Sequence, residues 1–255
     1  MRFMRMTALG IAPAWWLLAH AGAASASTFA VNPTQVHLSA ETPSRVLRLR
    51  NDGAEPLRFQ LSVSRWEQGP RGEIVLSPTE DVIFFPRLLS LAPREERSVR
   101  IGMATSVGTG TVEKTYRLYV QELPPPQATA TASPAIRVLT KMGIPIFIEP
   151  PRPSRRASIG GLDARLGSVS FQLVNGGTVH LPPQAIRVAG LAEGGSVVWE
   201  RALQGWYVLA GASSLHEVEL SAKECADAVE VVIETETPSS PIRARQPLGV
   251  AACAP

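Results

Sequence analysis

Helix-forming and metal-binding patterns are scarce in this chain of 255 residues. No run of a dozen residues repeats its apolar positions at the 3.6-residue spacing of an amphipathic helix, which argues against a helical bundle. The four histidines follow neither an HxxxH nor an HExxH spacing, so no motif indicates a metal site. A GxSxG elbow and a Gly-rich phosphate loop are also missing. We therefore expect a protein that is not an enzyme, with no catalytic residue, no metal and no cofactor.

Cysteine is limited to two residues, Cys225 and Cys253. In an exported protein an even pair is typical of a disulfide, and no CxxC motif or nearby histidine favours a catalytic or metal-bound thiol. A disulfide between them would contribute roughly 3–4 kcal/mol in the chain-entropy model. The structural bridge is the favoured interpretation, and a functional thiol is the alternative.

Long apolar runs are absent except near the N-terminus. Arg2 and Arg5 precede a mostly apolar stretch at residues 6–19, and Ala24-Ser25-Ala26 has the small-x-small pattern of a cleavage site. The stretch is too short to span a bilayer as a helix, although an N-terminal anchor is the alternative interpretation. We predict a signal peptide over residues 1–26, and an exported mature chain that does not insert into the membrane.

A large excess of charge of one sign is missing as well. The formal net charge is +3, and Arg2 and Arg5 of the predicted signal peptide supply two of the positive charges. Because the mature chain is nearly neutral, its overall charge gives no reason to expect nucleic acid as a partner.

Proline and glycine are abundant, at 22 and 20 residues, and they separate short segments in which apolar and polar residues alternate. In the clearest segment, Leu57–Ser64, the odd-numbered residues are apolar and the even-numbered residues are polar. This spacing predicts an all-β fold of sandwich domains. The proline-rich stretch 149–153 predicts a linker, which divides an N-terminal domain over residues 27–150 from a C-terminal domain over residues 151–255. In the second domain we expect strands at residues 168–173, 186–191, 196–200, 206–209, 215–220 and 228–234.

A strand starting near Ala135 follows a Pro/Ala/Thr-rich stretch and carries alternating apolar residues. Ile136, Val138 and Met142 share one parity, which is the pattern of a strand that could pair with a partner and fill its pockets. An exposed apolar edge strand is an aggregation hazard unless it is covered. An ordinary core or edge strand is the alternative interpretation.

Arg117 lies within an otherwise apolar strand, Tyr116–Val120. Such an arginine is either exposed at a sheet edge or used to bind an anion. Together with Lys141 across a cleft it could hold a carboxylate, because charge-assisted bonds from arginine are strong and bidentate.

Several short motifs, in this order and spacing, resemble the periplasmic chaperones of the chaperone–usher pilus pathway. They cover most of the mature chain and are strongest between Phe85 and Pro150. The segments that carry the resemblance are Phe85-Pro86, Leu91-Ala92-Pro93, Val99-Arg100-Ile101, Tyr116-Arg117-Leu118, Glu122-Leu123-Pro124 and Gly143-Ile144-Pro145-Ile146-Phe147.

The resemblance implies two immunoglobulin-like β-sandwich domains set at an angle, in the periplasm. It implies a donor strand, here Ile136, Val138 and Met142, that completes the fold of a pilin subunit for delivery to an outer-membrane usher. It also implies a basic pair that anchors the subunit's C-terminal carboxylate. The first strand, residues 32–37, has no arginine or lysine, which departs from the best-known branch of the family. The Gly-Ile-Pro-Ile-Phe segment at residues 143–147 and the Tyr-Arg-Leu strand at residues 116–118 are more similar to the archaic branch.

We therefore expect Arg117 and Lys141 to be the anchors, with Arg137 in reserve, and a self-capping dimer is a further possibility. Two rival interpretations stay open. An exported sandwich that binds carbohydrate or protein would use exposed aromatic residues, for which Trp199, Trp206 and Tyr207 are the candidates. An exported β-rich enzyme has weaker support, since no catalytic motif is present.

Overall fold

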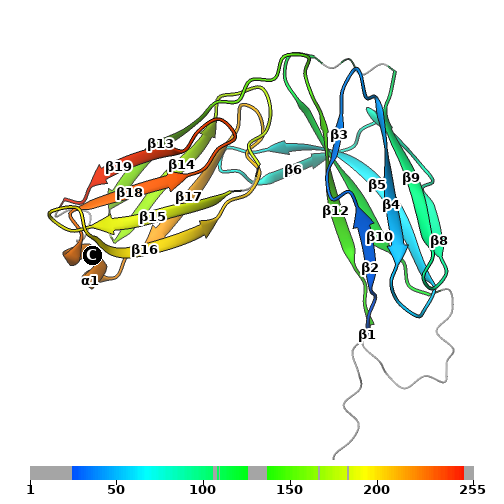
Figure 1. The fold of residues 1–255 in the computed structure, drawn as a ribbon, viewed down its shortest axis with the longest axis horizontal. Coiled ribbons are helices and arrows are strands. Elements are labelled where there is room, and N and C mark those ends of the chain that lie inside the picture. Colours follow the sequence, from blue (N-terminus) through cyan, green and yellow to red (C-terminus); the bar gives the residue numbers. More distant parts are fainter. Residues whose placement is uncertain are drawn as a thin grey trace, which may run out of the picture.

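The protein folds into two β-sandwich domains of immunoglobulin-like type, set at an angle to one another (Figure 1). The computed structural model describes residues 25–105, 108, 110–125, 137–165, 167–182 and 184–249. Within these ranges no helix has the length and hydropathy to cross a bilayer. The all-β expectation is confirmed.

The N-terminal sandwich is built from two sheets. One has the strand order β3-β12-β10-β5-β6, with β8 also paired to β5, and the other has the order β2-β4-β9-β7. The strands are β2 (Phe29–Asn32), β3 (Val36–Leu38), β4 (Ser44–Asn51), β5 (Leu57–Gln68), β6 (Ile74–Ser77), β7 (Val82–Phe85), β8 (Leu88–Leu91), β9 (Glu96–Met103), β10 (Lys114–Glu122) and β12 (Lys141–Ile148).

Alternation along β5 explains how the N-terminal core forms. Leu57, Phe59 and Leu61 point inward and are buried in the hydrophobic core. Burial of each such side chain contributes roughly 1.5–3 kcal/mol, and a slip of one residue would turn all of them toward solvent. The turn at residues 69–72 joins β5 to β6 as an antiparallel hairpin.

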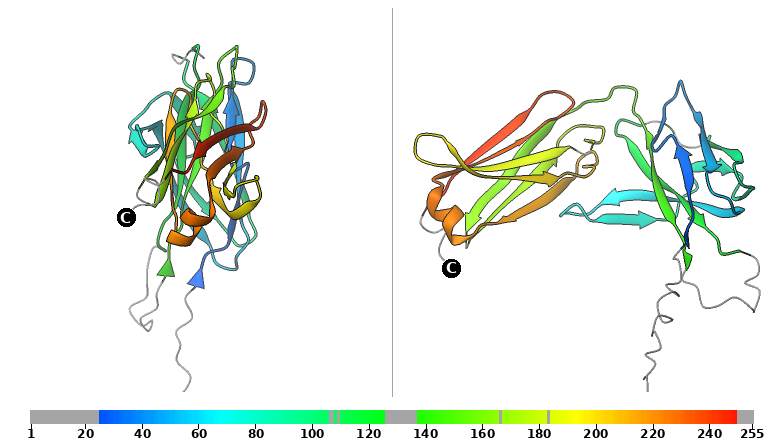
Figure 2. Two further views of the ribbon diagram at one scale, coloured as in Figure 1. Left: turned by 90° about the vertical axis from the view of Figure 1, so that its left-hand side faces the viewer. Right: turned by 60° about the horizontal axis from the view of Figure 1, so that its bottom comes forward.

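The expected continuous strand from Ala135 is interrupted. β12 begins at Lys141 and pairs with β10, whereas the two-residue strand β11 (Arg137–Val138) pairs in parallel with β1 (Ser25–Ala26). The second view of Figure 2 shows that this small ribbon projects beyond the end of the sandwich. β1 belongs to the predicted signal peptide, whose residues 1–24 lie outside the described ranges.

The C-terminal sandwich packs a three-stranded sheet, β13-β14-β17, against a four-stranded sheet, β16-β15-β18-β19. The connection between β12 and β13 contains the predicted boundary at residues 150 and 151. Strands β13 and β19 were not predicted. The elements are β13 (Ala157–Arg165), β14 (Ser168–Asn175), β15 (Ala185–Leu191), β16 (Val197–Gln204), β17 (Ser213–Glu219), α1 (Ala222–Asp227), β18 (Glu230–Thr235) and β19 (Ile242–Pro247).

Two local differences from the sequence expectation occur in this domain. The predicted strand at residues 206–209 is wrong, because this segment makes only an isolated bridge between Leu181 and Val208. Tyr207 and Leu209 pack instead between the domains, and Val208 packs in the core of the C-terminal domain. The short helix α1 was not predicted, and a capping box formed by Ser221 and Glu224 starts it.

Cys225 is buried on α1 and is not a free thiol. Cys253 lies outside the described residues, so the Cys225–Cys253 disulfide remains a prediction.

Candidate functional site

The outer face of the β3-β12-β10-β5-β6 sheet positions Arg117. Arg117 lies on β10, opposite Pro145 of β12 on one side and Ser64 of β5 on the other. Since β10 has a neighbour on each side, the alternative that Arg117 sits on an exposed edge strand is wrong. Its neighbours Tyr116 and Leu118 point into the core, so alternation directs Arg117 away from it.

The guanidinium of Arg117 lies among aromatic rings from both domains. Its carbon Cζ is 4.2 Å from the ring centroid of Trp66 on β5 and 5.6 Å from that of Trp206 in the C-terminal domain. These distances are within the range of cation–π attraction. The Nε atom of Arg117 is buried without a hydrogen-bond partner, as is Nε1 of Trp66, and no ion pair involving Arg117 occurs among the described residues. Two buried donors therefore have no acceptor within the described parts of the chain.

Lys141 lies on the same face but is not adjacent to Arg117. It is opposite Gln121, and its Nζ atom is 4.6 Å from the ring centroid of Tyr119. Along the ladder the two basic residues are four positions apart, which is roughly 14 Å in an antiparallel strand. Tyr119 lies between them, opposite Gly143, where an added Cβ would come within 3.2 Å of the Tyr119 ring. Arg117, Tyr119 and Lys141 therefore form a row along this face, and the two basic residues are not a compact pair.

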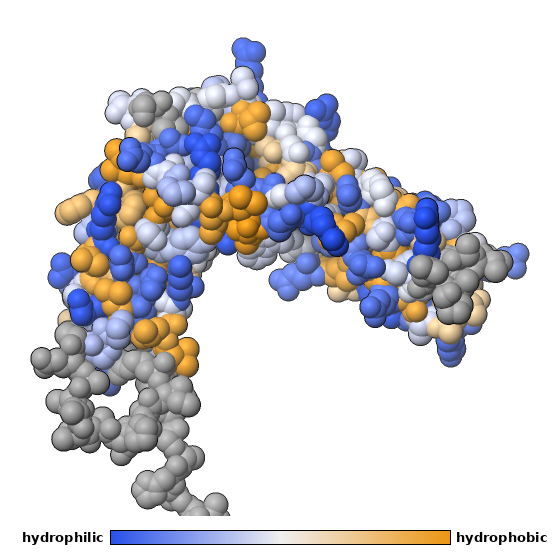
Figure 3. Space-filling model, turned by 180° about the vertical axis from the view of Figure 1, so that it is seen from behind, coloured by the Kyte–Doolittle hydropathy of each residue, from blue (hydrophilic) through white to orange (hydrophobic). Residues whose placement is uncertain are grey.

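The residues predicted for the donor strand have different surroundings. Val138 and Leu139 are 51% and 43% exposed, and Figure 3 shows apolar surface at this end of the N-terminal domain, beside the residues drawn in grey. Met142 is partly buried and packs against the protein's own core. Ile136 lies outside the described residues, and Arg137 is on β11, beyond the end of β12 that bears Lys141.

Glu122, at the end of β10, joins the N-terminal segment to the start of β12, which the sequence analysis did not anticipate. Its side chain is almost fully buried, with 2% of the residue exposed. Ser27 donates its hydroxyl to Oε1, and the amide of Thr140 donates to Oε2 at 3.2 Å. The amide of Glu122 in turn donates to the carbonyl of Thr140 at 2.9 Å.

A small hydrophobic cluster connects the two domains at the base of the angle. Trp66, Phe147, Tyr207 and Leu209 form it. Tyr207 and Trp199 are buried, so of the three aromatic residues considered for a glycan-binding sandwich Trp206 alone is exposed, at 50%. Trp66 could have been noticed in the sequence, because it continues the polar parity of Ser62 and Ser64.

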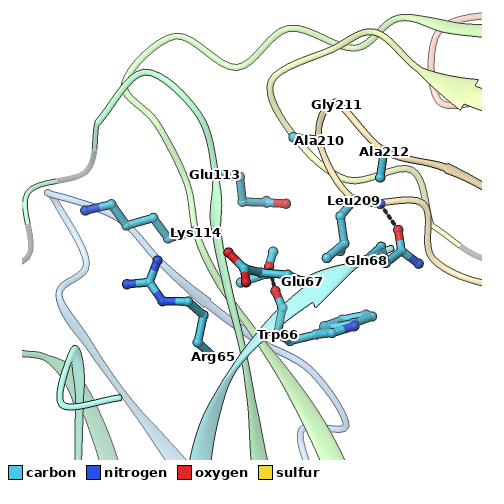
Figure 4. Close-up of a pocket in the computed structure, with 11 residues that line it drawn as sticks. Arg65, Trp66, Glu67, Gln68, Glu113, Lys114, Leu209, Ala210, Gly211 and Ala212 are labelled. Atoms are coloured by element: carbon cyan, nitrogen blue, oxygen red, sulfur yellow. Dashed lines mark hydrogen bonds between the residues drawn. The ribbon is translucent and has the colours of Figure 1, made fainter. Parts of the chain in front are cut away.

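Polar groups complete the domain junction. Gln68 donates to the carbonyl of Tyr207 at 2.7 Å. It also accepts from the amide of Leu209 at 2.7 Å (Figure 4). The buried carboxylate of Glu113 accepts from the amide of His180 at 2.8 Å and lies 2.9 Å from its Nδ1. The imidazole of His180 stacks on Phe147, with the ring centroids 3.7 Å apart. These contacts hold the C-terminal domain against the face that carries Arg117.

Comparison with known proteins shows which family the N-terminal domain resembles. Residues 28–153 match the family of pili and flagellar-assembly chaperones, PapD N-terminal domain. The chain carries a PapD-type N-terminal domain. No curated protein matches the sequence. Together with the two-domain fold, the match supports a pilus assembly chaperone, and the family points to a protein that is not an enzyme.

Solved structures share the two-domain fold of this chain at low sequence identity. The CsuC–CsuE complex from archaic Csu pili of Acinetobacter baumannii has 18% identity and a TM-score of 0.55, covering 86% of this chain and 97% of that chain. The E. coli chaperone DraB has 17% identity and a TM-score of 0.54, with coverages of 87% and 98%. The Pseudomonas aeruginosa CupB2 chaperone has 15% identity and a TM-score of 0.52, with coverages of 86% and 100%. The similarity shows the fold, and assignment to the archaic branch remains a prediction.

Proposed function

We propose that this protein is a periplasmic chaperone that binds pilin subunits by donating a β-strand and delivers them to an outer-membrane usher. The donated segment would run from Ile136 to Met142. The cleft between the domains would hold the C-terminal carboxylate of the subunit. The PapD-type N-terminal domain supports the chaperone role, and the residue assignments rest on the geometry of the site.

The unsatisfied guanidinium Nε of Arg117 is the main support for the anchor proposal. This buried nitrogen has no acceptor among the residues that the structure describes, and an unsatisfied buried donor on a charged group is costly. A carboxylate entering the cleft would provide the missing acceptor and neutralise the charge. Lys141, which lies over Tyr119, would make a second and weaker contact with the incoming chain. Arg137 is farther along the same edge, so it would meet a different part of the subunit.

The donor segment would supply hydrogen bonds from its backbone and apolar side chains. Full burial of an aliphatic side chain such as Ile136 contributes roughly 1.5–3 kcal/mol, before the cost of ordering the segment. Val138 would gain about half of that, because it is 51% exposed in the free protein. Met142 would add less, because part of its surface is already buried in the chaperone's own core. Cleavage after Ala26 would remove β1 and leave β11 without its partner strand.

Co-expression with a pilin subunit from the same organism tests the proposal. Affinity-tagged wild type should recover the subunit from a periplasmic extract, whereas Arg117→Met should recover at least tenfold less. Arg45→Met is the matched control, because Arg45 is exposed and belongs to the opposite sheet. Recovery of the subunit by Lys141→Met and by Arg137→Met shows how much each of these two basic residues contributes to binding.

A second arm identifies the group that Arg117 binds. A subunit extended by two glycines at its C-terminus moves its carboxylate, so its recovery should fall with wild-type chaperone and change little further with Arg117→Met. Equal recovery of the subunit by wild type and Arg117→Met would remove Arg117 from the anchor role. Failure of wild type to bind any co-expressed subunit would refute the chaperone proposal.

A further inference from the structure

Glu122 is a buried carboxylate that lacks a cationic partner in the described part of the chain. Only 2% of the residue is exposed, and its hydrogen-bond donors are the neutral hydroxyl of Ser27 and the neutral amide of Thr140. Buried carboxylates in proteins are normally paired with a positive charge, because removing a charge from water is costly. The surroundings of Glu122 are therefore incomplete in the unprocessed chain.

The missing positive charge has a natural source one residue after the predicted cleavage site. Cleavage after Ala26 converts the backbone nitrogen of Ser27 from an amide into an α-ammonium group. That nitrogen is on the same residue as the hydroxyl that already contacts Oε1 of Glu122. Ser27 is half-buried, and loss of Ser25 and Ala26 frees it to turn toward the carboxylate.

We propose that the α-ammonium group of Ser27, created by signal-peptide removal, forms an ion pair with Glu122 and completes the site that holds Thr140, near the C-terminal end of the donor segment. Glu122 acts as a positioning residue through Thr140, which it contacts with both its side chain and its backbone. Charge-assisted hydrogen bonds are about twice as strong as neutral ones. Processing would therefore fix Thr140, and with it the first residue of β12, more firmly than the uncleaved chain does. This inference rests on export and processing as set out in the proposed function.

The chemical reactivity of the N-terminal amine provides the test, and no subunit is needed for it. Processed protein is purified from the periplasm, its N-terminus is determined by intact mass, and acylation of the α-amine is followed at pH 7. An unpaired α-amine titrates near pH 8, and each pH unit by which pairing raises that value slows acylation about tenfold. We expect wild type to react about tenfold more slowly than Glu122→Gln, which keeps an oxygen acceptor for Thr140 but removes the charge.

Two further variants keep the outcome interpretable. Glu80→Gln, at an exposed position, should react like wild type. Insertion of Gly-Ser between Ala26 and Ser27 moves the new ammonium group away from Glu122, and should raise the acylation rate of the α-amine to that of Glu122→Gln. Because the insertion leaves Glu122 unchanged, it keeps the test valid if Glu122→Gln folds poorly. A first residue other than Ser27, or equal reactivity of wild type and the insertion variant, would overturn the inference. Subunit binding is scored separately, so a fast amine with normal binding rejects only the ion pair, and a slow amine without binding rejects only the chaperone role.

Discussion

Val138 offers the sharpest test of strand donation, because its side chain is half-exposed in the free protein and would be buried in the complex. It is 51% exposed on β11. Full burial of valine contributes roughly 1.5–3 kcal/mol, so about half of that gain is still available to a bound subunit. An aspartate there would lose this gain and also bring an unpaired carboxylate into an apolar groove, at a cost of a few kcal/mol.

The two effects of Val138→Asp together exceed about 3 kcal/mol, which corresponds to more than 100-fold weaker binding. The free chaperone should keep its stability to within about 0.5 kcal/mol, as expected for a surface substitution. Complex formation can be measured by diluting denatured pilin subunit into chaperone and quantifying the complex by size-exclusion chromatography. Urea unfolding of the free chaperone gives its stability.

Val197 provides the matched control. It is 48% exposed, it also lies on a strand, and it belongs to β16 of the C-terminal domain, away from the donor segment. Val197→Asp should therefore bind the subunit like wild type. Equal losses of binding in the two variants, or full binding by Val138→Asp, would refute the role of this segment as the donated strand.

Three other predictions concern stability and electrostatics in the two domains. Phe147→Ala should lower the free energy of unfolding by about 3–5 kcal/mol, because Phe147 is fully buried between the domains; the exposed Phe85→Ala should have little effect, and similar urea midpoints for the two variants would contradict this. Burial alone would raise the pKa of Asp81, but hydrogen bonds from Tyr116 and Arg65 and the charge of Arg65 lower it below 3.8. Asp81 should thus stabilise the fold above about pH 4 and lose this contribution as the pH falls further, so urea unfolding should separate wild type from Asp81→Asn more at pH 6 than at pH 3. The backbone amide of Ser221, Arg201 and the Ser221 hydroxyl lower the pKa of Glu224 to about 2; NMR titration of Ser221→Ala should show a higher value, and an unchanged one would exclude the hydroxyl's contribution.

Much of the N-terminal domain could be predicted because its strands alternate cleanly. The parity of Leu57, Phe59 and Leu61 identified the buried face of β5 without any knowledge of its neighbours. The same alternation made Arg117 conspicuous as a charged residue in an apolar strand. Its distance from Lys141 could not be predicted, because it depends on the β10–β12 register, which places Tyr119 between the two residues.

The elements that sequence patterns missed are those whose partners are distant in the chain. Tyr207 and Leu209 formed an apolar run typical of a strand, but their burial comes from Trp66 and Phe147 of the other domain. Helix α1 has only six residues, which is too short for a periodic pattern. Glu122 gave no signal because its partners, Ser27 and Thr140, are polar residues in unrelated segments.

The β10–β12 ladder has a consequence for which subunits the chaperone can accept. Arg117 is fixed opposite Pro145 of β12, and Val138 lies seven residues before Pro145, on β11, which Leu139 and Thr140 connect to β12. In an extended chain that separation is roughly 23 Å. A subunit must therefore place its C-terminus and its open groove at the same separation to use both points at once. Changing the sequence of residues 126–136 would leave this length unaltered, whereas inserting one residue between Thr140 and Pro145 would shift it and reverse the side on which Val138 points.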